Sequence, residues 1–198
     1  MLTFAAAVFF LIVTPGPGVL SLAGVGSAFG ARPGLRYLAG LFVGTNLVAL
    51  AVITGVAAIL LASPVLRTIL FAASTAYLLW LAYRIATAGG RIAITPATRP
   101  PGIRGGLALQ ALNPKAYVVN TTLFAGFGFL PTQPVLEVML KLLVLNAIWL
   151  ALHVAWLFAG IGLRQLDLAP GTQRAINVGM AVAMLTVVAL AVLSSVRG

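Results

Sequence analysis

The segments Thr14-Pro15-Gly16-Pro17-Gly18 and Asn113-Pro114-Lys115 place helix breakers inside two long apolar stretches of the chain. Proline lacks a backbone N–H, and its ring clashes with the preceding helical turn. Inside a lipid bilayer, the carbonyl groups freed by such a break need partners from protein, ions or water. Broken helices are therefore tolerated mainly where they line a cavity. Two breaks at matching places in the two halves of a chain indicate a solute-binding site near the middle of the membrane.

The composition is typical of an integral membrane protein. Of the 198 residues, 62% are hydrophobic and 7% are charged, whereas ~25% of residues are charged in an ordinary soluble domain. The net charge is +10, but the basic residues are scattered singly along the chain. This scatter disfavours a nucleic-acid partner and favours contact with the lipid bilayer. The chain contains no cysteine, which excludes disulfides and cysteine metal sites.

Six apolar runs are long enough to cross about 30 Å of hydrocarbon. They cover roughly residues 2–24, 38–62, 66–84, 105–130, 135–162 and 175–196. We therefore expect an all-α integral membrane protein with a single transmembrane domain over residues 1–198. No basic segment precedes the first run, so we expect it to be retained as a span rather than cleaved as a signal peptide.

The order of the runs predicts two inverted repeats of three helices each. The expected ranges are about 1–88 for the first repeat, 89–104 for a linker and 105–198 for the second repeat. Pro15 and Asn46 lie 31 residues apart, and Pro114 and Asn146 lie 32 residues apart. This spacing favours a repeat in which helices 1 and 4 are broken at Pro15 and Pro114.

The Lys and Arg residues predict the orientation in the membrane. Eight of them lie in the connections after spans 1, 3 and 5, and three lie on the opposite side. The richer side is expected to face the cytoplasm. Both termini are then expected on the outer side of the membrane.

The two breaks have the pattern of helix starts, in which Thr or Asn precedes a proline. A helix that starts inside the membrane presents unpaired N–H groups and a partial positive charge, which suit a carboxylate. Gly16 and Gly18 would let the backbone approach such a ligand closely. The alternative is a proline kink that serves helix packing only.

Lys115 lies about ten residues into its span, which is roughly 15 Å deep. A lysine at the bilayer centre costs at least ~3 kcal/mol. We therefore expect Lys115 to face water, a substrate or a partner, and to hold a carboxylate. The alternative is that its side chain extends to the membrane surface.

Other candidate site residues have less specific signals. His153 is the only histidine, and it is a candidate for proton coupling or for a structural hydrogen bond. Asn46 and Asn146 are candidates for substrate contact or for helix–helix contact. Trp80 is a candidate wall of a side-chain pocket or an interfacial anchor.

Two further patterns concern packing. Glu137 and Lys141 lie four residues apart and adjoin on one helix face. We expect them to form a surface ion pair. The small residues of Gly40-x-x-x-Gly44 are expected to let helices pack closely.

Taken together, the motifs resemble those of the LysE/RhtB family of amino-acid exporters. The shared features are Thr14-Pro15-Gly16-Pro17-Gly18, Gly40-Leu41-x-x-Gly44, Tyr77-Leu78-Leu79-Trp80-Leu81 before Arg84, and Leu112-Asn113-Pro114-Lys115. Ala82 is a departure, because a glycine is usual there. The resemblance implies a bacterial inner-membrane exporter of amino acids or close derivatives, driven by an ion gradient and assembled as a homodimer.

The expected function is therefore amino-acid export by a proton-coupled secondary transporter that works by alternating access. The chain lacks G-x-x-x-x-G-K-[ST], so ATP is not expected to drive it. No acidic residue lies deep in a span, which favours neutral over basic amino acids. No metal, cofactor or enzymatic activity is expected. The alternatives are export of a metal ion or another small solute, an intramembrane enzyme, and a structural subunit. The chain lacks the clustered metal ligands that a metal exporter needs and the catalytic groups that an enzyme needs.

Overall fold

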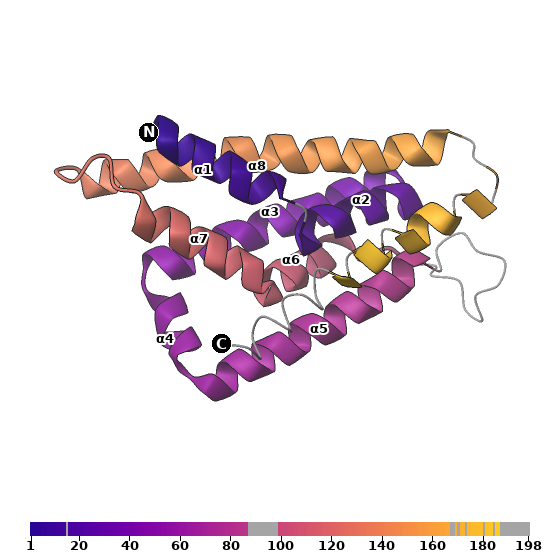
Figure 1. Ribbon diagram of the computed structural model, residues 1–198, viewed down its shortest axis with the longest axis horizontal. Coiled ribbons are helices and arrows are strands. Elements are labelled where there is room, and N and C mark those ends of the chain that lie inside the picture. The colour runs from indigo at the N-terminus through magenta and orange to yellow at the C-terminus, as the bar shows by residue number, and fades with distance from the viewer. Residues whose placement is uncertain are drawn as a thin grey trace.

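The computed structural model describes residues 1–14, 16–86, 99–166, 169, 171–172, 174–179, 181–183 and 185–186. Within these residues the chain is helical and contains no strand. The all-α prediction is confirmed for this part of the chain. Figure 1 shows most of the helices lying roughly along one long axis, with the short helix after residue 55 running across it.

The first span is a pair of helices. The first, α1 (Leu2–Val13), ends at Thr14, and the second, α2 (Pro17–Phe29), begins with a proline in its first position. The two helices are bent by 54° relative to each other. Pro15 itself lies outside the described residues. The second helix begins two residues later than the Thr14-Pro15 pattern predicts, because Pro17 occupies the first helical position.

The second span is shorter than the predicted run 38–62. Helix α3 (Ala31–Ile53) ends before a separate short helix, α4 (Val56–Ala62). Gly55 separates them with φ +78°, a left-handed conformation that glycine adopts without steric cost. The apolar run therefore continues past the point where the backbone turns. Helix α5 (Pro64–Ala86) follows and corresponds to the third predicted run.

In the second half, two shorter helices that meet at a proline are followed by a long helix. Helix α6 (Gly102–Leu112) ends at Asn113, and α7 (Pro114–Gly126) begins at the next residue. Helix α8 (Pro134–Gln165) is continuous over 32 residues. In the last predicted run, residues 175–179, 181–183 and 185–186 are helical.

Length and composition allow several of these helices to cross a membrane. Among the described residues, α3, residues 64–83 of α5 and residues 134–163 of α8 qualify, and the bent pair of α1 and α2 qualifies as a fourth span. Large apolar side chains such as Leu2, Ile59 and Val135 are more than 70% exposed, as lipid-facing residues would be. The chain is a multi-pass membrane protein.

The long helix of each half lies along the two shorter helices on either side of the break in the other half. Helix α8 contacts α1 and α2, and α3 contacts α6 and α7 (Figure 1). Small residues bring these pairs together. A Cβ placed on Gly40 of α3 would overlap the Ile103 carbonyl of α6, and one placed on Gly160 of α8 would overlap the Ala23 carbonyl of α2. The close packing predicted at Gly40 is confirmed.

Candidate functional site

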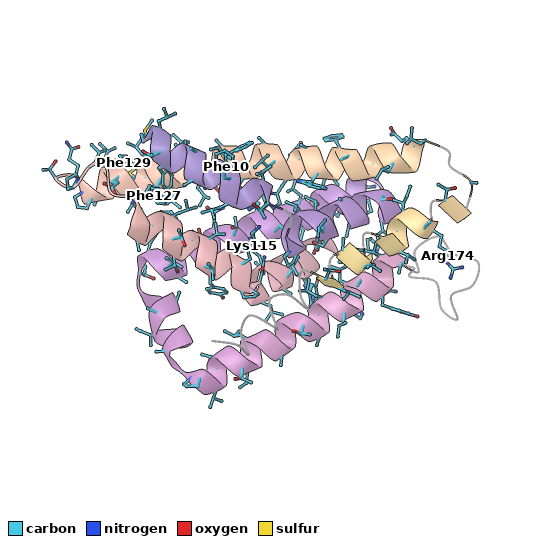
Figure 2. All side chains as sticks on the ribbon, in the orientation of Figure 1. Phe10, Lys115, Phe127, Phe129 and Arg174 are labelled. Atoms are coloured by element: carbon cyan, nitrogen blue, oxygen red, sulfur yellow. The ribbon has the colours of Figure 1, made fainter. Side chains whose placement is uncertain are left out.

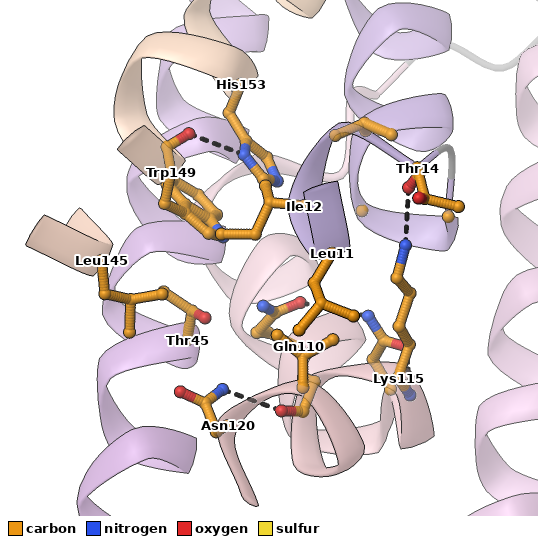
Figure 3. A pocket seen from close by; sticks show the side chains of 16 residues that line it. Leu11, Ile12, Thr14, Thr45, Gln110, Lys115, Asn120, Leu145, Trp149 and His153 are labelled. Carbon is orange, nitrogen blue, oxygen red and sulfur yellow. Dashed lines mark hydrogen bonds between the residues drawn. The ribbon is translucent and has the colours of Figure 1, made fainter. Parts of the chain in front are cut away.

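A small cavity lies where the two helix breaks meet (Figure 3). Its volume is about 60 Å³, which is room for roughly four water molecules at ~15 Å³ each. Its polar lining comes from both halves of the chain: Thr14, Thr45, Gln110, Asn113, Lys115, Asn120 and His153. The rest is glycine or apolar: Gly16, Gly18, Leu11, Ile12, Val19, Ala116, Val119, Leu145 and Trp149.

Lys115 joins the two breaks directly. Its Nζ donates a hydrogen bond of 2.6 Å to the backbone oxygen of Thr14, which is 101 residues away in the sequence. A Cβ placed on Gly16 would lie 2.9 Å from Lys115 Cδ and 3.2 Å from Nζ. The glycine therefore makes room for the lysine side chain. Figure 2 shows Lys115 midway along the molecule, and its charge lies beside the start of α2.

The two interior helix starts differ in how their N–H groups are satisfied. At α7, Asn113 Oδ1 accepts from the Lys115 N–H at 3.1 Å, and the Asn113 carbonyl accepts from the Ala116 N–H at 3.0 Å. The unpaired N–H groups expected at this start are therefore occupied, because asparagine is a strong N-cap. At α2, the N-cap is Gly16, and no side chain caps the helix. The partial positive charge of α2 is thus the one left for a ligand.

His153 presents a ring nitrogen to the cavity. Its Nδ1 lies 2.8 Å from the backbone oxygen of Trp149. A carbonyl only accepts hydrogen bonds, so Nδ1 carries the proton and Nε2 is an acceptor in the neutral ring. A Cβ placed on Gly18 would lie 3.5 Å from that Nε2. The ring stacks on Trp149 with centroids 3.5 Å apart, which fixes its orientation.

The predicted site residues divide into two groups. Thr14, Gly16, Gly18, Asn113, Lys115 and His153 line the cavity. Pro17 and Pro114 open the helices beside it, but neither lines it. Asn46 and Asn146 also lie outside the lining, and they donate hydrogen bonds of 2.9 Å to each other.

Trp80 lies on α5 and outside the cavity. It is 42% exposed, and its ring centroid lies 5.5 Å from that of Tyr77.

Sequence reasoning did not single out Gln110 as a site residue. Its side chain is 5% exposed, and its Oε1 accepts from Asn113 Nδ2 at 3.4 Å. The available signal was a glutamine in an apolar span, three residues before the helix break. Such a residue lies in the last turn of the first half-helix and so close to the break.

A network of hydroxyl groups lies between the cavity and the end of the molecule where α3 and α6 begin. The buried Tyr37 OH donates to Ser21 Oγ at 3.1 Å, and Ser21 Oγ donates to the Gly18 carbonyl at 2.9 Å. Tyr77 OH donates to the Gly105 carbonyl at 2.7 Å. We call these four hydrogen-bonding residues and Gly18 the tyrosine network. It connects α2 to α3 and α5 to α6.

A second network lies at the opposite end, where α1 and α8 begin. Lys141 Nζ lies 2.7 Å from Glu137 Oε1 and donates to the Phe124 carbonyl of α7 at 3.3 Å. Glu137 Oε2 accepts from the backbone N–H groups of Phe129 and Leu130. We call these residues the ion-pair network.

The prediction of a surface ion pair is wrong. Glu137 is 9% exposed and Lys141 is 3% exposed. Lys141 Nζ lies 5.9 Å from the ring centroid of Phe4 and 5.8 Å from that of Phe129. Figure 2 shows Phe127 and Phe129 gathered at this end of the molecule. The turn between α7 and α8 folds over the pair, and sequence spacing within α8 does not reveal that cover.

Comparison with known proteins identifies the family. Residues 9–195 match the family described as LysE type translocator. The chain belongs to this family. It is a translocator, and not an enzyme. No solved structure matches the chain.

The translocator is also similar to named efflux proteins. A leucine efflux protein of Klebsiella pneumoniae subsp. pneumoniae is 29% identical over 131 residues, which is 64% of this chain and 62% of that protein. A cysteine/O-acetylserine efflux protein of the same organism is 30% identical over 162 residues, which is 81% of this chain and 82% of that protein. The corresponding protein of Salmonella choleraesuis is 30% identical over 155 residues, or 75% of each chain. The match to the leucine efflux protein therefore spans less than two thirds of its length.

Proposed function

We propose that this translocator exports neutral amino acids across the bacterial inner membrane. The observation that carries the proposal is the cavity between the two breaks, where the Lys115 ammonium lies beside the uncapped N-terminus of α2. A cationic side chain and a helix N-terminus together favour a carboxylate. The names of the relatives, leucine efflux and cysteine/O-acetylserine efflux, agree with an amino acid as the substrate.

The lining of the cavity favours a neutral side chain. Among the described residues that line it, none is acidic, and seven are apolar. A basic substrate side chain would meet Lys115 without a carboxylate to balance it. An aliphatic or small polar side chain would instead contact residues such as Val119, Leu145 and Trp149. We therefore infer that lysine and arginine are poor substrates.

Substrate binding requires the cavity to widen. In this conformation, Lys115 Nζ is occupied by the Thr14 carbonyl, and the cavity has room for only a few water molecules. The carboxylate replaces the Thr14 carbonyl as the partner of Lys115, and the end of α1 moves away from α7. The break between α1 and α2 permits this movement, since no helical hydrogen bond has to be broken there.

We propose the two inverted repeats of residues 1–88 and 105–198 as the basis of this mechanism. Three features support them. Asn46 and Asn146 exchange equivalent hydrogen bonds, as side chains on a two-fold axis do. Helices α3 and α8 run in opposite directions (Figure 1). Each also packs on the broken span of the other half.

Alternating access follows from the two polar networks. Tyr37 lies nine residues before Asn46, and Glu137 lies nine residues before Asn146, so the two networks occupy equivalent positions in the two repeats. One holds α2 against α3, and the other holds the α7–α8 turn against α8. Opening one network while the other stays closed exposes the cavity to one side at a time.

Variants of the two networks are expected to act on opposite sides of the membrane. The chain has no cysteine, so Thr45→Cys introduces a single thiol in the cavity. Labelling of this thiol measures access to the cavity, with no other thiol in the protein to react. With this reporter, Tyr37→Phe is expected to raise labelling by an impermeant thiol reagent severalfold from the cytoplasmic side only, and Glu137→Gln from the outer side only. Thr122→Val, an exposed change on α7, is the control. Increases on the same side in both variants would contradict the assignment of two opposed gates.

We propose His153 as the proton-coupling residue, because its Nε2 faces the cavity that also holds Lys115. A proton on Nε2 places a second positive charge in the same cavity as Lys115, so proton and substrate occupancy affect each other. His153→Gln is expected to retain export down a substrate gradient and to lose the stimulation by an imposed pH gradient. Measurement in proteoliposomes tests this, with Thr122→Val as control. Undiminished stimulation would assign His153 a structural role.

The orientation and the assembly are also proposals. Arg32 and Arg36 begin α3, at the end of the molecule where Figure 2 shows Arg174, which supports placing this end in the cytoplasm and both termini outside. The close-packing faces of Gly40 and Gly160 are used within the chain. The proposed homodimer therefore rests on the family resemblance.

Counterflow in proteoliposomes tests the proposed function. Vesicles loaded with unlabelled leucine are expected to accumulate labelled leucine, and vesicles loaded with lysine are not. Cysteine and O-acetylserine extend the panel to the other named substrates of relatives. Absence of counterflow with every amino acid would contradict amino-acid export and favour export of a metal ion or another small solute.

A further inference from the structure

Asn120 of α7 carries an unused hydrogen-bond acceptor. The residue is 2% exposed, and its Nδ2 donates to the Ala116 carbonyl at 2.8 Å. This bond identifies the amide nitrogen, because the Ala116 carbonyl can accept from the amide N–H of Asn120 but not from its amide oxygen. Among the buried side-chain nitrogen and oxygen atoms of the described residues, Asn120 Oδ1 alone lacks a partner. A buried acceptor without a donor is unfavourable, which indicates that a ligand supplies the missing donor.

The unused oxygen belongs to the cavity between the helix breaks. Asn120 lines that cavity together with Lys115 and Gln110. Figure 3 shows Asn120 and Lys115 on opposite sides of it, with Gln110 between them. The cavity therefore has a cationic end at Lys115 and an acceptor end at Asn120.

The two ends match the two charged groups of an amino acid. The proposed function assigns the carboxylate to Lys115 and the α2 N-terminus. An ammonium group has three donors and no acceptor, so it needs oxygens on the other side. We propose that Asn120 Oδ1 binds the α-ammonium group of the transported amino acid. This inference rests on the proposed function and extends it to the group that distinguishes an amino acid from a carboxylic acid.

A neutral amide suits this role in a cavity that already holds Lys115. It accepts a hydrogen bond from the ammonium without adding a negative charge, so the empty cavity does not hold an internal Lys–carboxylate pair that the substrate would have to break. A sodium ion also binds amide oxygens, and measuring the counterflow of the same variants with and without sodium separates the two.

The test compares leucine with its analogue that lacks the amino group, 4-methylpentanoate, as competitors of leucine counterflow by the full-length protein in proteoliposomes. Wild type is expected to bind leucine at least ~10-fold more tightly, the effect of one hydrogen bond to a charged group. Asn120→Leu is expected to lose that preference by weakening leucine alone. Asn120→Asp, which keeps an acceptor, is expected to retain the preference, although its pairing with Lys115 weakens the binding of both ligands. The control is Thr122→Val, an exposed change two residues further along α7.

The possible outcomes distinguish failure of the Asn120 assignment from failure of the proposed function. No counterflow by wild type with any amino acid would contradict the proposed function. Wild-type counterflow with an unchanged preference for leucine in Asn120→Leu would overturn the Asn120 assignment. The Asn120 assignment would also be overturned if Asn120→Leu lost a dependence of counterflow on sodium while keeping its preference for leucine. Thermal unfolding shows whether Asn120→Leu folds. If it does not, Asn120→Asp provides the test, and loss of the leucine preference in a folded Asn120→Asp protein would overturn the Asn120 assignment.

Discussion

Lys115→Met is expected to reduce amino-acid export by about 10–100-fold while the protein still inserts into the membrane. The variant removes the cation that we assign to the substrate carboxylate, and a hydrogen bond to a charged group contributes ~1.5–3 kcal/mol, which corresponds to that range of binding constants. Methionine fills nearly the same volume and adds no buried charge. The protein should therefore unfold at a similar temperature, since only the contact of Nζ with the Thr14 carbonyl is lost.

Initial rates of counterflow at several leucine concentrations measure the effect. Arg104→Met is the matched control, because it removes an exposed cation near the start of α6, outside the cavity. Lys115→Arg is expected to be intermediate, since it keeps the charge but does not fit the space beside Gly16. Normal export by Lys115→Met would remove Lys115 from the substrate site.

Gly40→Val is expected to prevent stable folding. The first atom of any side chain at this position overlaps the backbone of α6 at Ile103, so α3 and α6 must separate. Overpacking against movable side chains costs ~1–3 kcal/mol, and a fixed backbone contact is less tolerant. The fraction of monodisperse protein in detergent and its unfolding temperature are expected to fall sharply.

Gly162→Val provides the control for this stability prediction. It introduces the same residue in helix α8, where, within the described part of the chain, no atom beyond the neighbouring residues and the backbone of α8 itself lies within 4 Å of an added Cβ. Both substitutions have the same intrinsic effect on helix formation, so the difference between them reports packing. Equal unfolding temperatures for the two variants would show that α3 and α6 do not depend on this contact.

The parts of the fold that were predictable are those with local signals. Pro114 marks the start of α7, as predicted. Two other local signals were misread: α2 begins at Pro17 rather than at Pro15, and the backbone turns at Gly55 inside the apolar run 38–62. The depth of Lys115 in its span indicated that its ammonium group faces water, a substrate or a partner, and the Thr14 carbonyl is a partner. A lysine or proline in an apolar span is a local conflict, and such conflicts gather at functional sites.

The parts that sequence could not supply depend on contacts between distant segments. Glu137 and Lys141 read as a surface pair from their spacing, but the α7–α8 turn and Phe4 cover them. The Asn113-Pro114 pattern predicted a helix start with unpaired N–H groups, but the Asn113 side chain accepts a hydrogen bond from one of them, the Lys115 N–H. Trp80 was a candidate in the sequence and Gln110 was not, but the fold places Gln110 at the cavity and Trp80 outside it.

The account depends most on the claim that the two helix breaks together form one binding site for an amino acid. A structure of the purified protein with leucine bound tests this most directly. We predict the leucine carboxylate within hydrogen-bond distance of Lys115 Nζ and at the N-terminus of α2, with the Lys115–Thr14 contact broken. Leucine bound elsewhere, with Lys115 still bonded to the Thr14 carbonyl, would contradict the account.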